Sequence, residues 1–179
     1  MARPRVRPPS PAPRSQRLVS WWWDYLLILA WLAVIFLLIG LPQILGWLDL
    51  SAIWTDQVAG DIAITVLTVL PYFLYLTVTE WRPPHATLGK RRAGITVIGK
   101  NGEPPGSGAV LVRNLVKVLP WQLGHMGTTR LIYTTEVTTA AISFQTASLA
   151  FLALVVVPIL FGKAGIHDLL AGTRVTSAE

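Results

Sequence analysis

The sequence predicts an all-α membrane protein, a small helical bundle of three to four membrane segments with a basic cytoplasmic loop. Of its 179 residues, 53% are apolar and only 13% are charged, against roughly 25% charged residues in a typical soluble domain. Three long stretches contain no charged residue at all. This balance excludes a disordered chain and argues against a soluble enzyme. The absence of cysteine excludes disulfides and thiolate metal sites.

The first membrane segment is expected at residues 21–41. Seventeen uncharged residues, 25–41, follow a cluster of three tryptophans and Asp24. At about 1.5 Å per residue, a helix over this segment covers roughly the 30 Å hydrocarbon thickness of a bilayer. The run is longer than the apolar part of a signal peptide. We therefore expect a membrane anchor that is not removed.

Two further segments are expected at residues 61–81 and 136–161. The second segment contains Pro71, which transmembrane helices tolerate as a kink. The third is rich in Ala, Ser and Thr in its first half. Such small residues suit close packing of helices in a membrane. The alternative is a less hydrophobic half that lies near the lipid headgroups, and the sequence favours neither.

The positions of the basic residues predict the orientation of the chain. Five Arg precede the first segment and five basic residues follow the second, whereas the loop 42–61 contains three Asp and no Lys or Arg. The positive-inside rule places the N-terminus and residues 82–117 in the cytoplasm. The net charge of +6 is thus an orientation signal, and it indicates no nucleic-acid partner.

The fourth element, residues 107–133, allows two interpretations. Arg113 and Lys117 lie four apart on one helix face, as in an amphipathic helix at the cytoplasmic interface. Pro120, Gly124 and Gly127 instead suit a broken or re-entrant segment. Three spans would leave the C-terminus outside, and four membrane elements would return it to the cytoplasm. We favour the even number.

Two short β-branched stretches frame the last third of the chain. Residues 94–98 precede a Lys-Asn-Gly turn, and residues 173–176 lie near the C-terminus. They could pair as a short β-strand pair if both lie on one side of the membrane, or remain two unpaired extended pieces. Residues 1–16, rich in Pro and Arg, predict a disordered cytoplasmic tail near anionic headgroups. The membrane domain would then cover residues 17–176.

No catalytic, cofactor or metal site is predicted, so we expect no enzyme. The three His have no ligand partner at metal-binding spacing, and no Ser lies in a nucleophile elbow. A phosphate-loop interpretation of Gly89 and Lys90 fails because Pro84 stands where the first Gly is required. Ionisable residues in a membrane are functional candidates by default. At the membrane edges these are Arg17, Asp24, Glu80, Arg91, Arg113 and Asp168.

Arg17 and Asp24 share a helix face but are separated by about 10.5 Å along the helix axis. A direct salt bridge between them is therefore strained. A charge network of Arg17, Asp24, Asp168 and a cation from the loop would satisfy every charge. Such pairing matters because an uncompensated charge costs several kcal/mol when it is buried.

Several of these motifs occur together in one known family. Arg17, Asp24 and Asp168, the last within HDLLAGTRV, are accompanied by TLGKR, GITVIGKNGEPP and RNLVKVLPW in the same order. Over residues 17–175 the chain resembles the RDD family of small bacterial membrane proteins, which is named for one Arg and two Asp. The resemblance implies a bacterial cytoplasmic membrane protein with these three signature residues. It also implies supporting roles for Thr87, Gly89, Lys90, Arg91, Arg113, Asn114, Gly172 and Thr173.

Two functional hypotheses follow. The resemblance implies a transporter, or a transporter component, for small cations or protons. Because three or four helices are too few to enclose a transport site, this hypothesis implies a homo-oligomer or a membrane partner. In the alternative, the chain is a scaffold or assembly protein whose charged residues are structural. In both cases the expected partners include the bilayer, with anionic headgroups near the basic loop and the N-terminal tail.

Overall fold

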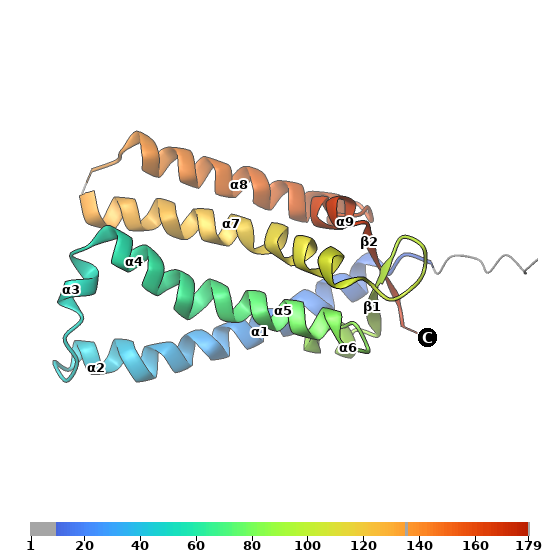
Figure 1. The fold of residues 1–179 in the computed structure, drawn as a ribbon, viewed down its shortest axis with the longest axis horizontal. Helices are drawn as coiled ribbons and strands as arrows, with labels where there is room; N and C mark the ends of the chain where they lie inside the picture. Colours follow the sequence, from blue (N-terminus) through green and yellow to red (C-terminus); the bar gives the residue numbers. More distant parts are fainter. Residues whose placement is uncertain (1–9, 135, 179) are drawn as a thin grey trace, which may run out of the picture.

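The computed structural model describes residues 10–134 and 136–178, which form a helical bundle with a small sheet at one end (Figure 1). Within these residues, three helices are long and apolar enough to cross a membrane: Arg14–Ile44, Gln57–Trp81 and Thr139–Leu160. They coincide with the three predicted segments, which confirms the fold class. In chain order the elements are α1 (Arg14–Ile35), η1 (Phe36–Gly40), α2 (Leu41–Ile44), α3 (Ser51–Trp54), α4 (Gln57–Ile64), η2 (Thr65–Val69), α5 (Leu70–Trp81), α6 (Leu88–Arg92), β1 (Ile95–Gly99), α7 (Ser107–Thr134), α8 (Thr139–Leu160), α9 (Ile166–Ala171) and β2 (Thr173–Ser177).

The first two long helices each contain one π-helical turn followed by a proline. η1 joins α1 to α2, which contains Pro42, and η2 joins α4 to α5, which contains Pro71. Proline lacks the N–H of a regular helix, and its ring clashes with the preceding turn. A wider turn immediately before each ring relieves that clash, so each helix continues across its proline.

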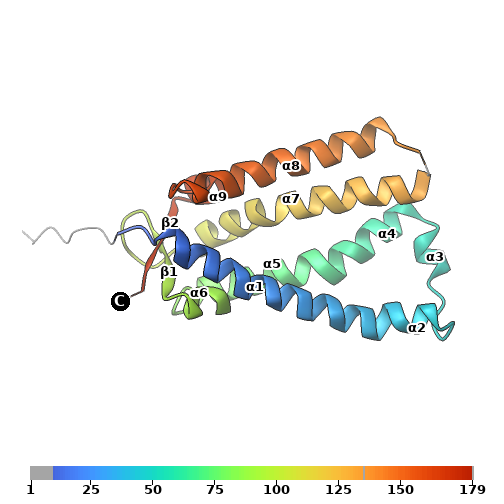
Figure 2. The same ribbon diagram turned by 180° about the vertical axis from the view of Figure 1, so that it is seen from behind.

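Helices α7 and α8 run side by side along the length of the bundle (Figures 1 and 2). A Cβ atom on Gly127 would lie 2.9 Å from Cγ of Gln145, and one on Gly124 would lie 3.1 Å from Oγ of Ser148. The glycines of α7 thus allow a close approach of α8. The hydroxyl of Ser148 also donates to the carbonyl of Pro120 at 2.7 Å.

The segment that contains Pro120, Gly124 and Gly127 is therefore one continuous helix. This corrects the re-entrant interpretation of residues 107–133, because the glycines serve helix contact and not a break in the backbone. It also supports close packing as the role of the small residues in the first half of α8, where Ala141 is 1% exposed.

The two β-branched stretches pair with each other. β1 and β2 are antiparallel, with Val97 opposite Val175. Both valines are buried together with Ile95 and Ala12 in a small apolar core. The pairing of the two stretches, one of the alternatives that the sequence left open, is thus confirmed. This strand pair joins the loop that was predicted to be cytoplasmic to the C-terminal end of the chain.

The chain before α1 also reaches this sheet. Pro11 forms an isolated bridge with Thr176, and the amide of Ala12 donates to the carbonyl of Val175 at 3.0 Å. Helix α1 begins at Arg14. Residues 11–16 therefore differ from the disordered tail predicted for residues 1–16, because Ala12 adds apolar contact to the sheet. Residues 1–9 of that prediction lie outside the described residues.

The sheet defines one end of the bundle, here called the sheet end; the opposite end, with α2 and α3, is called the loop end. α1 starts at the sheet end, the α4–α5 helix returns to it, α7 leaves it and α8 returns once more (Figure 2). The beginning of α1 and strand β2 therefore lie at the same end. This arrangement agrees with an even number of long helices.

We predict that the sheet end faces the cytoplasm. Because the chain has no cysteine, single Cys variants report the position of each end without background. Ala178→Cys should escape a membrane-impermeant maleimide in intact cells and react after permeabilisation. Ala52→Cys, at the loop end, should react in intact cells. Labelling of Ala178→Cys in intact cells would contradict the orientation.

Candidate functional site

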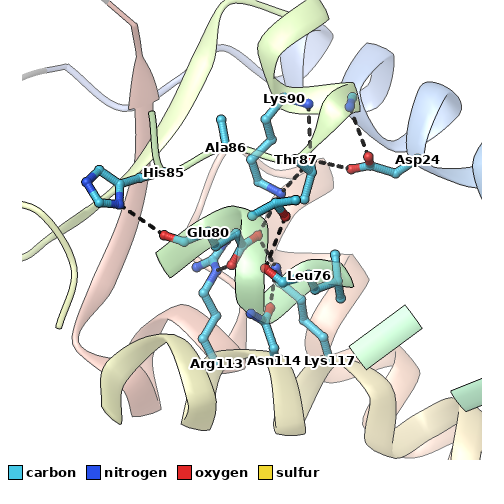
Figure 3. Close-up of polar contacts among 12 residues, drawn as sticks. Asp24, Leu76, Glu80, His85, Ala86, Thr87, Lys90, Arg113, Asn114 and Lys117 are labelled. Atoms are coloured by element: carbon cyan, nitrogen blue, oxygen red, sulfur yellow. Dashed lines mark hydrogen bonds and ion pairs between the residues drawn. The ribbon is translucent and has the colours of Figure 1, made fainter. Parts of the chain in front are cut away.

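A cluster of buried charges lies at the sheet end, where α5, α6 and α7 meet (Figure 3). At its centre is Glu80 of α5, whose side chain is 0% exposed. Oε1 of Glu80 lies 2.9 Å from Nζ of Lys90 and 2.8 Å from Nζ of Lys117. Oε2 of Glu80 lies 2.9 Å from Nε of Arg113. Three cations from two other helices thus compensate one carboxylate that burial would otherwise strongly disfavour.

Arg113 connects Glu80 to a second buried carboxylate, Asp168 of α9. Nη1 of Arg113 donates to Oδ1 of Asp168 and, at 3.0 Å, to the hydroxyl of Thr173. That hydroxyl in turn donates to Oδ1 of Asp168 at 2.8 Å. All these side chains are at most 2% exposed. Arg113 therefore links α5, α7, α9 and the start of β2.

Two polar neighbours complete this region. Nε2 of His167 lies 3.4 Å from Oδ2 of Asp168. Burial holds the pKa of His167 well below its usual value, and the charges of Arg113 and Lys117 lower it further. The imidazole is therefore neutral at pH 7, and its contact with Asp168 is not an ion pair. Asn114 accepts a hydrogen bond from Nζ of Lys117 at 3.0 Å.

Asp24 is buried, with 5% exposure, and is held by neutral donors. Its carboxylate accepts hydrogen bonds from the hydroxyl of Tyr75 at 3.0 Å, the hydroxyl of Thr87 at 2.7 Å and the amide of Gly89 at 2.9 Å. Thr87 also caps α6 by accepting from the amide of Lys90 at 3.2 Å. The turn into α6 therefore surrounds the carboxylate of Asp24 with hydrogen-bond donors.

Gly89 is required for this arrangement. A Cβ atom at Gly89 would lie 2.1 Å from the carbonyl oxygen of Ser20 and 2.8 Å from Oδ1 of Asp24. No real Cβ atom tolerates such a distance from backbone. The glycine thus lets α6 approach α1 closely enough for the Gly89 amide to reach the carboxylate.

Arg17 bonds to backbone carbonyls and not to a carboxylate. Its guanidinium donates to the carbonyl of Ala12 at 3.2 Å and to the carbonyls of Lys163 and Val175 at 3.3 Å each. These three carbonyls belong to the segment before α1, the α8–α9 connection and β2. Arg17 is 6% exposed. It therefore joins the two ends of the chain at the sheet end.

The structure corrects the predicted charge network. Among the described residues, no ion pair joins Arg17, Asp24 and Asp168 to one another. Arg17 bonds backbone carbonyls, Asp24 bonds neutral donors, and Asp168 pairs with Arg113. The reason is geometric: the turn into α6 covers Asp24, and the two chain ends surround Arg17. The prediction named no particular loop cation; in the structure Lys90 of the loop pairs with Glu80, outside that network.

The remaining supporting residues have local roles. Nε of Arg91 donates to the carbonyl of Ala86 at 3.1 Å, which stabilises the turn into α6. Gly172 ends α9 with a φ of +63°, a left-handed conformation that favours glycine. This conformation places Thr173 at the start of β2, next to Asp168.

The sequence alone assigns no partners to Glu80 and Lys117. Glu80 was recognised as a charge at a membrane edge, but its central place was missed. A usable signal existed: a carboxylate near the end of an apolar span requires a cation, and Arg113 and Lys117 present two on one helix face. Within residues 10–134 and 136–178, no group of His, Asp or Glu is arranged to hold a metal ion.

The motifs that build this region extend along most of the chain, and a family model described as the RDD family matches residues 11–172. The chain belongs to the RDD family. No curated protein and no solved structure matches this RDD protein significantly. Arg17, Asp24 and Asp168 are each buried. Each of them fixes a different part of the sheet end: the chain ends, the turn into α6 and the junction of α7 with α9, respectively.

We predict that Glu80→Gln destabilises the RDD protein by about 3–5 kcal/mol, because Lys90 and Lys117 lose their counter-charge and Arg113 keeps only Asp168. The matched variant Glu103→Gln, at an exposed carboxylate in a turn, should leave stability nearly unchanged. Thermal or chemical unfolding of both purified variants in detergent measures the difference. Equal stability of the two variants would show that the cluster does not hold the fold.

We also predict that Gly89→Ala lowers stability by about 1–3 kcal/mol, as expected for overpacking against backbone. The control is Gly108→Ala in the first turn of α7, where a Cβ atom meets nothing within 4 Å. That variant should be neutral or slightly stabilising, because alanine favours the helix. Unfolding midpoints of the two variants test this, and a neutral Gly89→Ala would contradict the close approach of α6.

Proposed function

We propose that this RDD protein is a transporter, or a transporter component, that moves protons or small cations across the bacterial cytoplasmic membrane. The observation that carries the proposal is a succession of polar contacts between the α4–α5 helix and α7. It runs from the loop end towards Asp24 at the sheet end. Polar side chains in a membrane segment are costly and mark ion or proton pathways.

The succession begins near the loop end with Asp61. Its Oδ2 lies 3.2 Å from Nη1 of Arg130, and its Oδ1 accepts a hydrogen bond from Thr129. About one helical turn further into the bundle, Nε2 of Gln122 donates to the hydroxyl of Thr65 at 3.0 Å. All of these contacts join the α4–α5 helix to α7.

The middle of the succession is centred on His125. Its Nδ1 lies 3.4 Å from the hydroxyl of Thr68, and its Nε2 accepts from the indole of Trp121 at 2.7 Å. A neutral ring in this position carries its proton on Nδ1, facing Thr68. Imidazole can accept and release protons at physiological pH, which suits a relay. Thr65 and Thr68 both lie in the π-helical turn η2, and π turns are frequent at functional sites.

Aromatic residues continue from there to the sheet end. The rings of Trp121 and Tyr72 lie 6.2 Å apart, as do those of Tyr72 and Tyr75. The hydroxyl of Tyr75 donates to Asp24 at 3.0 Å. The succession therefore reaches a signature residue of the family.

The positive-inside rule supports a multi-pass orientation with the N-terminus and the sheet end in the cytoplasm. Asp61 would then lie towards the outside and Asp24 towards the cytoplasm. Because four helices are too few to enclose a transport site alone, the proposal includes a homo-oligomer or a membrane partner that completes the pathway. The wide apolar surfaces of α1 and α8 are available for lipid or for such a partner.

A second candidate function is a non-transporting scaffold or assembly protein. It is favoured by the compensation of Glu80 and Asp168 within the chain, which gives these charges a structural role. In this case the basic sheet end would bind anionic headgroups or a protein partner. The two candidates differ in whether the middle of the α4–α5/α7 interface affects ion flux.

Reconstitution into liposomes separates them. With a pH-sensitive dye inside and imposed proton, Na⁺ or K⁺ gradients, the parent protein should dissipate at least one gradient faster than empty liposomes. Gln122→Leu and His125→Leu should remove most of that flux, because each interrupts the polar succession. Gln145→Leu, on α8 and outside the succession, is the matched control and should retain it. No flux above empty liposomes with any cation and pH would favour the scaffold.

A further inference from the structure

Two adjoining cavities lie beside α1, and both are also lined by α5 and α7. The cavity at the sheet end is lined by α8 and α9 as well. One, of about 260 Å³, lies at the sheet end, and the other, of about 220 Å³, lies further along α1 towards the loop end. They share Ile28, Tyr72 and Trp121 as lining residues. On α1 the lining extends from Arg17 to Leu32, which is about 22 Å at the rise of a helix.

The cavity at the sheet end has a polar wall with a surplus of cations. Its charged lining residues are Arg17, Lys90, Arg113, Lys117, Asp24 and Asp168. Four cations thus face two carboxylates, and Glu80 lies behind the wall as a third. The hydroxyl of Ser20 also lines this cavity. It is buried, with 1% exposure, and has no hydrogen-bond partner among the described residues. An unsatisfied buried hydroxyl indicates a group that a ligand would complete.

The second cavity has a wall of a different kind. Its lining contains no charged residue and is dominated by Leu27, Leu32, Val69 and Val118, with the faces of Trp31 and Pro71. It lies beside the part of α1 that is apolar enough to cross the hydrocarbon. A ligand that fills both cavities must therefore be charged at one end and apolar along the rest of its length.

We propose that the two cavities together bind one anionic phospholipid, with its phosphate at the polar wall and one acyl chain in the apolar cavity. The order of the two cavities matches a lipid in its own leaflet, in which the headgroup lies at the interface and the chain points to the midplane. The combined length of the two cavities exceeds the roughly 15 Å that one leaflet contributes to the hydrocarbon, so it has room for an acyl chain together with its headgroup. A phosphate suits the guanidinium of Arg17, which offers a planar set of donors, and the hydroxyl of Ser20 can donate to it.

This site does not depend on the proposed transport, because a lipid at this position can regulate or simply stabilise the bundle. Lipid binding here requires only charge complementarity at one end and a continuous apolar wall at the other. These two features distinguish the site from ordinary annular lipid, which contacts the outer faces of the helices and shows little headgroup preference.

The test uses the purified full chain in detergent with a phosphatidylglycerol that carries a diazirine near the end of one acyl chain. After illumination, mass spectrometry should locate the label on the peptides that contain Leu32 and Val118. Phosphatidylcholine with the same chain should label these peptides much less. Millimolar inorganic phosphate should not displace the lipid, because it cannot occupy the apolar cavity.

Variants assign the two ends separately. Leu32→Trp fills the apolar cavity and should abolish most of the labelling, whereas Leu29→Trp, at an exposed position of the same helix, should not. Arg17→Gln should weaken phosphatidylglycerol binding about tenfold, as expected for loss of a charge-assisted contact. Arg14→Gln, at an exposed Arg, is its control. Arg17 also joins the two chain ends, so Arg17→Gln can weaken the fold as well as lipid binding. Leu32→Trp tests the site without changing a charged residue.

Three results would overturn the proposal. The first is equal labelling by phosphatidylcholine and phosphatidylglycerol in the parent protein. The second is labelling that remains unchanged in Leu32→Trp, which would place the chain on the outer surface. The third is complete displacement of the lipid by inorganic phosphate, which would show that the polar wall binds a soluble anion and that the acyl chain contributes nothing.

Discussion

The burial of Glu80 is the constraint on which the rest of the sheet end depends. A carboxylate with 0% exposure near the end of a membrane helix is tolerated only when cations surround it. The helix that carries Glu80 cannot supply them, so they come from α6 and α7. Because of this requirement, the loop after α5, which was predicted to be cytoplasmic, returns to α5 and brings Lys90 to Glu80. The same requirement places Arg113 where it can also reach Asp168. The positions of α6, α9 and β2 follow from that one compensation.

The same compensation creates the polar wall beside α1. Lys90, Arg113 and Lys117 are brought together by Glu80, and they outnumber Glu80 and Asp168 by three charges to two. All three cations also line the cavity at the sheet end. Arg17 adds another cation from the opposite side while it joins the chain ends through backbone carbonyls. The cluster that stabilises the fold therefore also contributes the cations of the wall on which the proposed lipid site depends.

Much of the fold could be predicted from the sequence, because membrane helices are defined by long apolar runs and by the bias of Lys and Arg. The strand pair could be suggested from β-branched residues but not decided, since pairing depends on both pieces reaching one end. The course of α7 was ambiguous because Gly124 and Gly127 suit a break as well as a helix contact, and only the position of α8 distinguishes them. The charged residues of the site were identified, but their partners were not. The spacing of seven residues predicts the distance between Arg17 and Asp24 along the helix. It does not predict that the turn into α6, which is distant in the sequence, covers Asp24.

The contrast between Asp24 and Glu80 bears on which carboxylate could take part in ion movement. Glu80 is bound by three cations, and without its charge Lys90 and Lys117 would have no other carboxylate partner among the described residues. Asp24 has neutral donors only, from Tyr75, Thr87 and Gly89. Asp24 therefore takes part in no ion pair among the described residues, whereas Glu80 takes part in three. The ring contacts that continue from the α4–α5/α7 interface end at Tyr75, which donates to Asp24, so the carboxylate at the end of this succession is the one held by neutral donors. Glu80 in turn keeps α6 in place through Lys90, so that the donors of Thr87 and Gly89 remain around Asp24.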